Sequence, residues 1–407
     1  LSIYKSFKPN ILFKFKNILI KVFNFFFKFW IQRQKIFIYK TYTGKFFEYL
    51  LNFSFGQLPV LIEKYQSLSS PNLVIRKKEK LSFEEKNEFE KFININFFNH
   101  IPKCYLEDFK FIDRLINESA IPQKPKVLLS TTAIYSDDIF TKVCASQKEL
   151  KNNSFIYCQH GGAYGQISYT WSEEHESKIS DQYLTWGWNS EKKENIIDFG
   201  VIKNIYSFKF KKPKKLNKII YFLRSRSKYP ARVDSSTGGN TMCKYFQNCL
   251  EFFKNPLSLV FQNKIYARFH ERNFQWNHED IWKREIKNLN FSRSSDESLS
   301  AVYKNYDLII YSYIGTGFLE SLALNKPNIV IENLNNWPLR ENVLNDFKKL
   351  KQAGIFFENN EEALIHLNKY KDNLHEWWHN PEVIKIKDEF ISKYSRLITP
   401  YKKFNFL

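Results

Sequence analysis

Short apolar runs that end in polar loops recur along the chain, and they restrict its fold more than any other feature. Residues 126–130 (KVLLS) and 155–158 (FIYC) have the length and apolar content of buried strands. Between them, Asp137 and Asp138 have side chains that favour the start of a helix. Strand, helix and strand in this order form the unit of a doubly wound α/β sheet. Ligands of such sheets bind beyond the carboxyl ends of the strands, so the loops after these runs are the first candidates for a site.

The loop after residues 155–158 carries a histidine and a glycine pair, in the order Gln159, His160, Gly161 and Gly162. Acidic residues follow at Glu173, Glu174 and Glu176. Paired glycines let a ligand approach the main chain, and an imidazole titrates near neutral pH, so His160 beside carboxylates suits acid–base chemistry or phosphate contact. Alternatively, the segment is a tight turn in which His160 only hydrogen-bonds to the backbone. The residues alone leave both interpretations open.

Basic side chains accompany two later apolar runs. The runs are residues 219–223 and 265–269, and the basic residues in or after them are Arg224, Arg226, Arg268 and His270. Alternation along a strand puts Arg268 and His270 on the same face. Cationic side chains at the carboxyl end of a strand are placed to bind a phosphate or diphosphate. A solvated surface loop is the alternative for Arg224 and Arg226.

Residues 307–331 predict a strand, a loop that begins at Ser312, a helix from residue 316 to 324, and a second strand. The amino terminus of that helix, with Thr316 and Gly317, leaves main-chain N–H groups available for a phosphate. Glu320, one turn further on, is predicted to reach a ribose hydroxyl. The sequence has no GxxxxGKS loop and no clear GxGxxG, which argues against an NTPase or a dehydrogenase.

The chain of 407 residues is long enough for two domains. A lysine run with one proline, FKFKKPKKLNK at residues 208–218, separates patterned segments and is predicted to be the linker. We therefore expect an N-terminal α/β domain at residues 1–207 and a second α/β domain at residues 219–384, with a helix or tail at residues 385–407.

The charge of the chain is strongly positive, since 62 Lys and Arg outnumber 42 Asp and Glu and give a net charge of +20. This favours phosphates, acidic glycans or an anionic membrane as partners. Lys, Asn, Ile and Phe are all abundant, as in proteins from AT-rich genomes. Part of the positive charge therefore reflects codon composition and gives no information about a partner. Five scattered cysteines form no zinc-binding pattern and fit a reducing cytoplasm. Because the first residue is Leu1 and not Met, the sequence leaves open whether a segment precedes it.

The N-terminal segment, residues 1–47, has ten basic residues and no acidic one. At residues 11–31, polar side chains recur at helical spacing and form one narrow stripe on an otherwise apolar helix, at Lys14, Asn17, Lys21, Asn24 and Lys28. The lysines are too frequent for a membrane span. The pattern is typical of a helix in a membrane interface, or of a helix that packs on the N-terminal domain, and the sequence does not separate these alternatives.

Several of these motifs together resemble the LIC12162 family of transferases, which is found among genes for cell-surface polysaccharides. The matching runs are FGQLPV from Phe55, YLED from Tyr105, QHGGAYG from Gln159, SEEHE, KISD, YLTWGW and TGFLESLALNKP from Thr316. Members of that family resemble GT-B glycosyltransferases. The resemblance implies two Rossmann-like α/β domains that face a cleft, with a C-terminal segment that crosses back to the first domain.

By the same resemblance, the chain is expected to transfer a sugar from a nucleotide-activated donor to a surface polysaccharide, such as O-antigen, or to a lipid-linked acceptor. The donor is expected to contact Arg224, Arg226, Arg268, His270, Ser312, Thr316, Gly317 and Glu320. The acceptor side is expected to hold Gln159, Gly161, Gly162, Tyr164 and Asp181, with His160, Glu174 and Glu173 as catalytic candidates. The Arg-rich site suggests a CMP-linked acidic sugar, while UDP- and GDP-sugars stay open.

No Asp-x-Asp motif is present, and GT-B enzymes generally stabilise the leaving phosphate without a metal, so we expect no obligatory cation and no other cofactor. The expected location is the cytoplasm or the inner face of the membrane. One alternative is a phosphotransferase of the same fold that uses a CDP-linked alditol. A basic RNA-binding protein is the non-enzymatic alternative, but the basic residues are dispersed and no nucleic-acid-binding module is evident, so no nucleic acid is expected as a partner.

Overall fold

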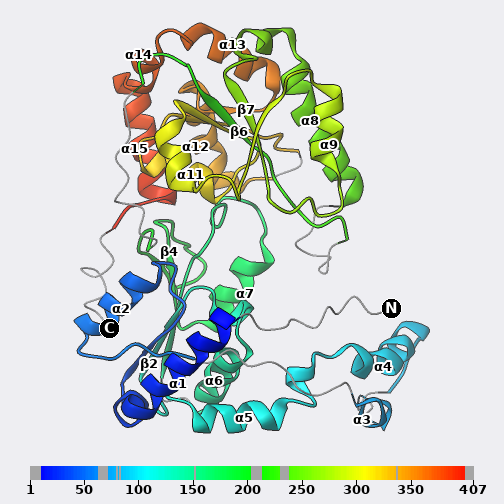
Figure 1. Ribbon diagram of the computed structural model, residues 1–407, viewed down its shortest axis with the longest axis vertical. Coiled ribbons are helices and arrows are strands. Elements are labelled where there is room, and N and C mark those ends of the chain that lie inside the picture. The colour runs from blue at the N-terminus through cyan, green and yellow to red at the C-terminus, as the bar shows by residue number, and fades with distance from the viewer. Residues whose placement is uncertain are drawn as a thin grey trace. The chain divides into compact units, whose positions relative to one another are not determined.

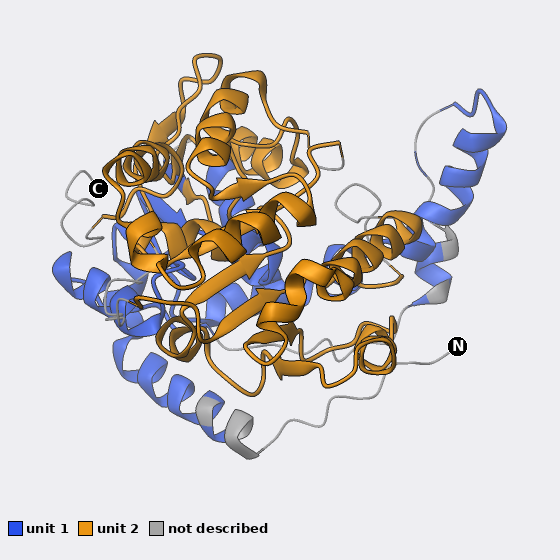
Figure 2. Cartoon of the chain, turned by 90° about the horizontal axis from the view of Figure 1, so that it is seen from above, with its two compact units in different colours: residues 1–156, 404–407 blue, residues 157–403 orange. Residues whose placement is uncertain are grey.

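The computed structural model describes residues 11–62, 72–78, 81, 84–150, 153–202, 213–229, 238–335 and 338–398. The chain forms two compact units, which Figure 2 shows in different colours. Unit 1 contains residues 1–156 and 404–407, and unit 2 contains residues 157–403. This division differs from the predicted boundary at residues 207–219. Residues 208–212 of the predicted linker lie outside the described part, so the linker stays a prediction.

Unit 1 is mainly helical, with one strand directly after its first helix and another near residue 130. Its elements are α1 (Ile11–Gln32), β1 (Ile36–Ile38), α2 (Lys45–Ser54), α3 (Leu73–Lys78), α4 (Glu88–His100), η1 (Lys103–Tyr105), α5 (Phe109–Glu118), β2 (Val127–Ser130), η2 (Ala133–Tyr135) and α6 (Asp138–Glu149) (Figure 1). The predicted helix after Asp137 is confirmed, and the Asp137 side chain caps it by accepting a hydrogen bond from the N–H of Phe140 at 3.2 Å.

β3 (Ser154–Cys158) spans the division between the units, and all later elements belong to unit 2. They are α7 (Trp171–Ile179), β4 (Gln182–Thr185), β5 (Ile196–Asp198), β6 (Ile219–Phe222), α8 (Gly239–Lys254), η3 (Pro256–Phe261), β7 (Ile265–Phe269), α9 (His278–Glu285), β8 (Asn290–Arg293), α10 (Leu299–Asn305), β9 (Leu308–Tyr311), α11 (Thr316–Ala323), β10 (Asn328–Ile331), α12 (Glu341–Gln352), β11 (Phe356–Phe357), α13 (Asn360–Tyr370), α14 (Leu374–Trp378) and α15 (Pro381–Tyr394).

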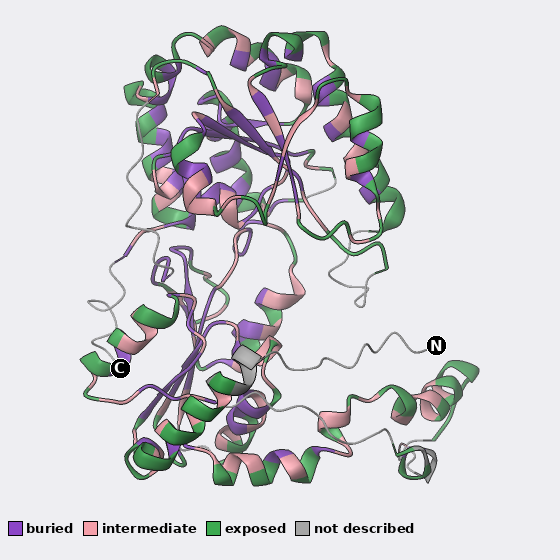
Figure 3. Ribbon diagram, in the orientation of Figure 1, coloured by how far each residue is buried: buried purple, intermediate pink, exposed green. Residues whose placement is uncertain are grey.

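The strands form two sheets, one of five strands in the order β1-β2-β3-β4-β5 and one of six in the order β11-β10-β9-β6-β7-β8. The pairs β1–β2 and β4–β5 are parallel, as are all five pairs of the second sheet. The strands are predominantly buried (Figure 3), which explains why they read as continuous apolar runs in the sequence. The predicted α/β class with two parallel sheets is confirmed.

Helices cover both faces of the six-stranded sheet. Phe222 of β6 is in register with Tyr311 of β9, so Tyr221 and Tyr311 point to opposite faces. Tyr221 packs against Phe252 of α8, and Tyr311 packs against Phe318 of α11. A core of aromatic side chains therefore fixes α8 and α11 on either side of the strands, with the carboxyl ends of β6 and β9 between them.

The segment after α15 binds residues 186–202 within unit 2. The N–H of Arg396 donates to the carbonyl of Trp186 at 2.9 Å, and its guanidinium pairs with Asp198 at 3.2 Å. Val201 forms a parallel bridge with Leu397. These contacts join residues 186–202, which were predicted to belong to the first domain, to the C-terminal part of the chain. They explain why the compact units divide at residue 156 and not near residue 207.

Candidate functional site

The turn that follows β3, residues 159–162, is called the QHGG turn below, and the buried amide of Gln159 anchors it. The Oε1 atom of Gln159 accepts hydrogen bonds from the backbone N–H of Trp186 at 3.0 Å and from the indole N–H of Trp188 at 2.8 Å. Its Nε2 atom donates to the carbonyl of Gly161 at 2.6 Å. The amide oxygen of Gln159 therefore holds the turn against the segment after β4, and the amide nitrogen holds the turn in its own conformation.

The QHGG turn packs directly on the amino terminus of α11. The N–H of Gly162 donates to Oγ1 of Thr316 at 2.8 Å, which joins positions 154 residues apart. A Cβ atom at Gly162 would lie 2.6 Å from backbone atoms of Gly315 and Thr316, so only glycine allows this approach. Ala163 follows with a φ of 74°, a left-handed conformation that is rare outside glycine and that clusters at functional sites. The structure thus brings together the QHGG turn, which was expected on the acceptor side, and the start of α11, which was expected on the donor side.

His160 lies in this turn beside a buried carboxylate. Its Nδ1 atom is 3.4 Å from Oε1 of Glu176, and its ring meets the ring of Tyr164 edge to face at 5.6 Å. Glu176 is fully buried and accepts hydrogen bonds from the hydroxyls of Tyr164 at 3.2 Å and Tyr183 at 2.8 Å. Burial lowers the pKa of His160 to about 4, so its imidazole is neutral at pH 7. With 27% of its side chain exposed, His160 combines a fixed orientation with access to a ligand.

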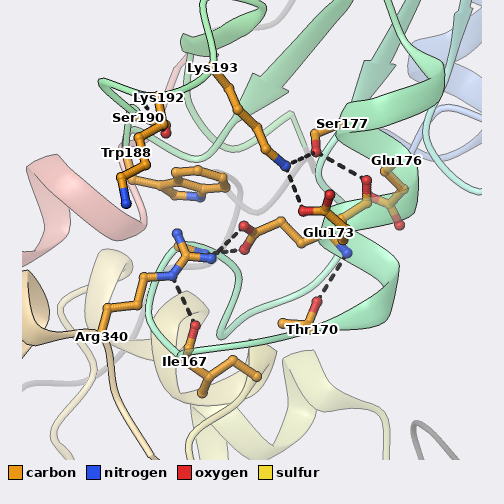
Figure 4. A network of polar contacts seen from close by, with 12 residues as sticks. Ile167, Thr170, Glu173, Glu176, Ser177, Trp188, Ser190, Lys192, Lys193 and Arg340 are labelled. Atoms are coloured by element: carbon orange, nitrogen blue, oxygen red, sulfur yellow. Dashed lines mark hydrogen bonds and ion pairs between the residues drawn. The ribbon is translucent and has the colours of Figure 1, made fainter.

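Glu173 has a structural environment that the sequence did not reveal. Its Oε2 atom accepts a hydrogen bond from the N–H of Gly165 at 2.7 Å, and its Oε1 atom pairs with Arg340 at 2.5 Å. The guanidinium of Arg340 also donates to the carbonyl of Ile167 at 2.9 Å (Figure 4). Both oxygens of Glu173 therefore hold the loop after the QHGG turn in place, and the residue is buried.

Glu174 and Asp181 lie away from the turn. Glu174 is exposed and pairs with Lys193 at 2.6 Å, and the hydrogen bond from Lys193 lowers the pKa of Glu174. Asp181 is exposed and precedes β4, whereas Trp186 and Trp188, which contact Gln159, follow that strand. The length of β4 therefore separates Asp181 from the QHGG turn.

Arg224 lines a pocket of about 370 Å³ at the carboxyl ends of β6, β9 and β10. Its guanidinium pairs with the largely buried Glu332 at 2.9 Å. The backbone N–H of Arg224 donates to the hydroxyl of Tyr245 at 2.5 Å. That hydroxyl also hydrogen-bonds with Ser312, at 2.5 Å. Burial raises the pKa of Glu332 to about 7, although Arg224 opposes the shift. Two predicted residues, Arg224 and Ser312, therefore share one polar pocket.

Arg268 and His270 are not joined to that pocket by any of their described contacts. Arg268 is buried and donates to the carbonyl of Glu297 at 2.7 Å and to Oγ of Ser292 at 3.3 Å. The Nδ1 atom of His270 accepts a hydrogen bond from the N–H of Arg272 at 3.0 Å. The two contacts of Arg268 hold its side chain against β8 and the loop after it, and no motif in that segment would predict them. Arg226 is exposed in the loop after β6.

The three predicted residues of α11 have different environments. Thr316 bonds to Gly162, as described above. A Cβ atom at Gly317 would lie 2.9 Å from the ring of Tyr311, so this glycine is needed for packing on β9. Glu320 is 1% exposed, so a ribose approaching from solvent does not reach it in this structure. The N–H groups of the first helical turn have no carbonyl partner within the helix, which makes the amino terminus of α11 a suitable place for an anion.

Three residues of these sites were not predicted: Tyr245, Glu332 and Arg340. Glu332 directly follows β10, so the rule that polar residues after a strand line the site could have identified it. Tyr245 lies within α8 and Arg340 precedes α12, and neither belongs to a recognisable motif. Among the residues that the structure describes, no group of three or more His, Cys, Asp or Glu side chains could hold a metal ion.

Comparison with known families gives one match, which covers nearly the whole chain. The model described as "LIC12162 family transferase" matches residues 2–400. A comparison with curated proteins finds no match.

Solved structures give weak similarities. TarM of S. aureus, in complex with fondaparinux, alpha-GlcNAc-glycerol and UDP, has a TM-score of 0.41 and 11% identity over 66% of this chain and 52% of that chain. The chain thus spans about half the length of TarM. MurG of Acinetobacter baumannii has a TM-score of 0.38 and 10% identity over 88% and 95%. The spinosyn rhamnosyltransferase SpnG with spinosyn aglycone has a TM-score of 0.36 and 12% identity over 86% and 87%. No assignment rests on similarities at this level.

Proposed function

Because the chain belongs to the LIC12162 family of transferases, we propose that it is a GT-B-type glycosyltransferase that moves a sugar from a nucleotide-activated donor to a glycan or lipid-linked acceptor. The observation that carries this proposal is the contact between the QHGG turn and the amino terminus of α11. Through this contact, the residue two positions after His160 meets a helix terminus that favours anions. A proton acceptor beside a phosphate site is what transfer from a nucleotide-sugar requires.

In the proposed reaction, the acceptor hydroxyl attacks the anomeric carbon of the donor, and the bond from that carbon to the phosphate oxygen breaks. His160 takes the proton of the attacking hydroxyl, since its imidazole is neutral and partly exposed. Glu176, whose carboxylate lies 3.4 Å from Nδ1, orients the imidazole. The N–H groups at the start of α11 stabilise the charge on the leaving phosphate without a metal ion.

The proposed donor site joins the amino terminus of α11 with the pocket at Arg224 and Ser312. The guanidinium of Arg224 is held by its ion pair with Glu332 and lies 5.4 Å from the centre of the Tyr245 ring, so it is ready to bind a phosphate with little loss of side-chain freedom. The exposed Arg226 adds a second cation. A CMP-linked acidic sugar suits such a site, and the same cations would also bind the phosphates of a UDP- or GDP-sugar. Glu174 and Glu173 stay secondary candidates for the base, because both form ion pairs.

We propose a cell-surface polysaccharide such as O-antigen, or its lipid-linked precursor, as the acceptor, with the enzyme in the cytoplasm or at the inner face of the membrane. The net charge of +20 supports an acidic glycan or an anionic membrane as a partner.

Replacing Arg224 by alanine tests the donor site. The variant is expected to bind the cognate nucleotide about 10- to 100-fold more weakly, the range expected when a charged hydrogen bond is lost. Calorimetry with CMP, CDP, UDP and GDP measures the affinity and identifies the base. Lys254→Ala is the matched control, because it removes the same charge from an exposed ion pair with Glu285 elsewhere in unit 2. Unchanged affinity in a folded Arg224→Ala protein would remove the pocket from the donor site.

A further inference from the structure

α1 packs on unit 1 through its polar stripe. The side-chain amide of Asn24 donates to the carbonyl of Leu61 at 3.1 Å, and Asn24 is buried. One turn later, Lys28 donates to the carbonyl of Glu118 at 2.8 Å. Gln32, one turn further, donates to the carbonyl of Ser119 at 3.1 Å. The hydrophilic side of the helix is therefore turned toward the protein.

The opposite side of α1 is apolar and faces solvent, as the green colour along much of this helix indicates (Figure 3). Phe25 is 82% exposed. The other large side chains of this side are also exposed, namely Phe15, Ile18, Leu19, Val22, Phe26, Phe29 and Trp30. This set is called the apolar face of α1 below. A helix on a water-soluble surface normally has the reverse orientation, and continuous apolar patches of this kind mark sites of interaction.

Basic residues border the apolar face. Arg33 is exposed at the end of the helix and lies over the ring of Phe29 at 3.6 Å. Lys35, two residues further along the chain, is exposed as well. Residues 1–47 contain ten basic residues and no acidic one. Aromatic side chains beside cations are typical of helices that lie in the interface of an anionic bilayer.

We propose that the apolar face of α1 docks on the surface of a bilayer that contains anionic lipid, with its aromatic side chains among the acyl chains and its cations at the headgroups. Within the described part of the chain, no helix combines the length and apolar content needed to cross a bilayer, so α1 would lie along the surface. A second copy of the chain is a poor occupant, because it would bring two cationic segments together. This inference does not depend on the proposed function.

The test compares flotation of the full-length protein with vesicles of phosphatidylcholine alone and vesicles that also contain phosphatidylglycerol. Wild type is expected to bind the anionic vesicles, and the variant Phe25→Ser/Phe26→Ser/Phe29→Ser should lose more than tenfold in partitioning with an unchanged melting temperature. The matched control is Phe89→Ser/Phe92→Ser/Ile95→Ser on α4, which removes three equally exposed apolar side chains from the same unit and should bind as wild type.

Four results would overturn the proposal: no binding by wild type, equal binding to neutral vesicles, full binding by the folded α1 variant, or equal losses in the α1 and α4 variants. A concentration-dependent dimer in analytical ultracentrifugation that only the α1 substitutions abolish would also overturn it, since a second copy would then cover the face. Nucleotide binding is measured on the same proteins. The proposed nucleotide site consists of unit 2 residues, whereas docking uses α1 of unit 1. Loss of nucleotide binding would therefore indicate a failure of the proposed function, and loss of vesicle binding alone a failure of docking.

Discussion

Replacing His160 by alanine is expected to lower turnover by about 10²–10⁴, the range for loss of a positioned acid–base group. The melting temperature should stay nearly unchanged, because the buried Glu176 keeps its hydrogen bonds from Tyr164 and Tyr183. His175→Ala is the matched control, since His175 belongs to helix α7 and its ring stacks on that of Trp171. That variant should retain wild-type turnover.

The pH dependence of the same variants gives a second readout. Because burial lowers the pKa of His160 to about 4, its imidazole should be neutral between pH 8 and about 5, and turnover limited by it should be flat there and fall toward pH 4. The unfolded chain protonates this histidine already near pH ~6.5, so His160 makes folding stability fall as the pH drops from there toward 4. Lost stability with retained specific activity in His160→Ala would show that the residue is structural.

Replacing Gly162 by alanine is expected to destabilise the protein by roughly 1–3 kcal/mol, the usual cost of forcing extra atoms into a packed site. The added Cβ would lie 2.6 Å from backbone atoms of Gly315 and Thr316, so the QHGG turn and α11 must separate. Since a displacement of about 1 Å can cost 10²-fold in rate, turnover should fall by about that factor. Thermal unfolding and product formation measure the two effects.

Gly161→Ala is the control for this substitution. The nearest atom to a Cβ at Gly161 is Oγ1 of Thr316 at 3.7 Å, an ordinary contact, so this variant should retain wild-type stability. If the two alanine variants have the same melting temperature, the close approach of the turn to α11 does not contribute to stability.

The strands of the fold could be predicted from the sequence because buried parallel strands are apolar along their whole length. The runs at residues 126–130, 155–158 and 219–223 are confirmed as β2, β3 and β6. The polar residues at their ends were predicted by the same rule, and the Arg224 pocket lies where that rule places it. The compact units, in contrast, depend on contacts between distant segments, such as Val201 with Leu397, that no local pattern contains.

The environments of individual charged residues could not be predicted in the same way. The charge of Glu320 suggests a ligand contact, yet its position on α11 directs the side chain toward the protein core. Arg268 donates to the backbone carbonyl of Glu297. Because every residue type has a backbone carbonyl, the sequence gives no sign of this contact. The polar stripe of α1 was recognised, but its spacing does not say whether the stripe or the apolar face contacts the protein. These outcomes depend on tertiary partners and not on the residues themselves.

The most direct test of the central claim is product analysis with the purified full-length chain. CMP-, UDP- and GDP-linked sugars are incubated with soluble glycans and lipid-linked acceptors, and the products are identified by mass spectrometry and bond-specific hydrolysis. The proposed function predicts release of the nucleotide and one sugar joined to the acceptor by a glycosidic bond, with both formed about 10²–10⁴-fold more slowly in His160→Ala. A phosphodiester-linked product, as expected for transfer from a CDP-alditol, would contradict it, and so would the absence of transfer from every donor tested.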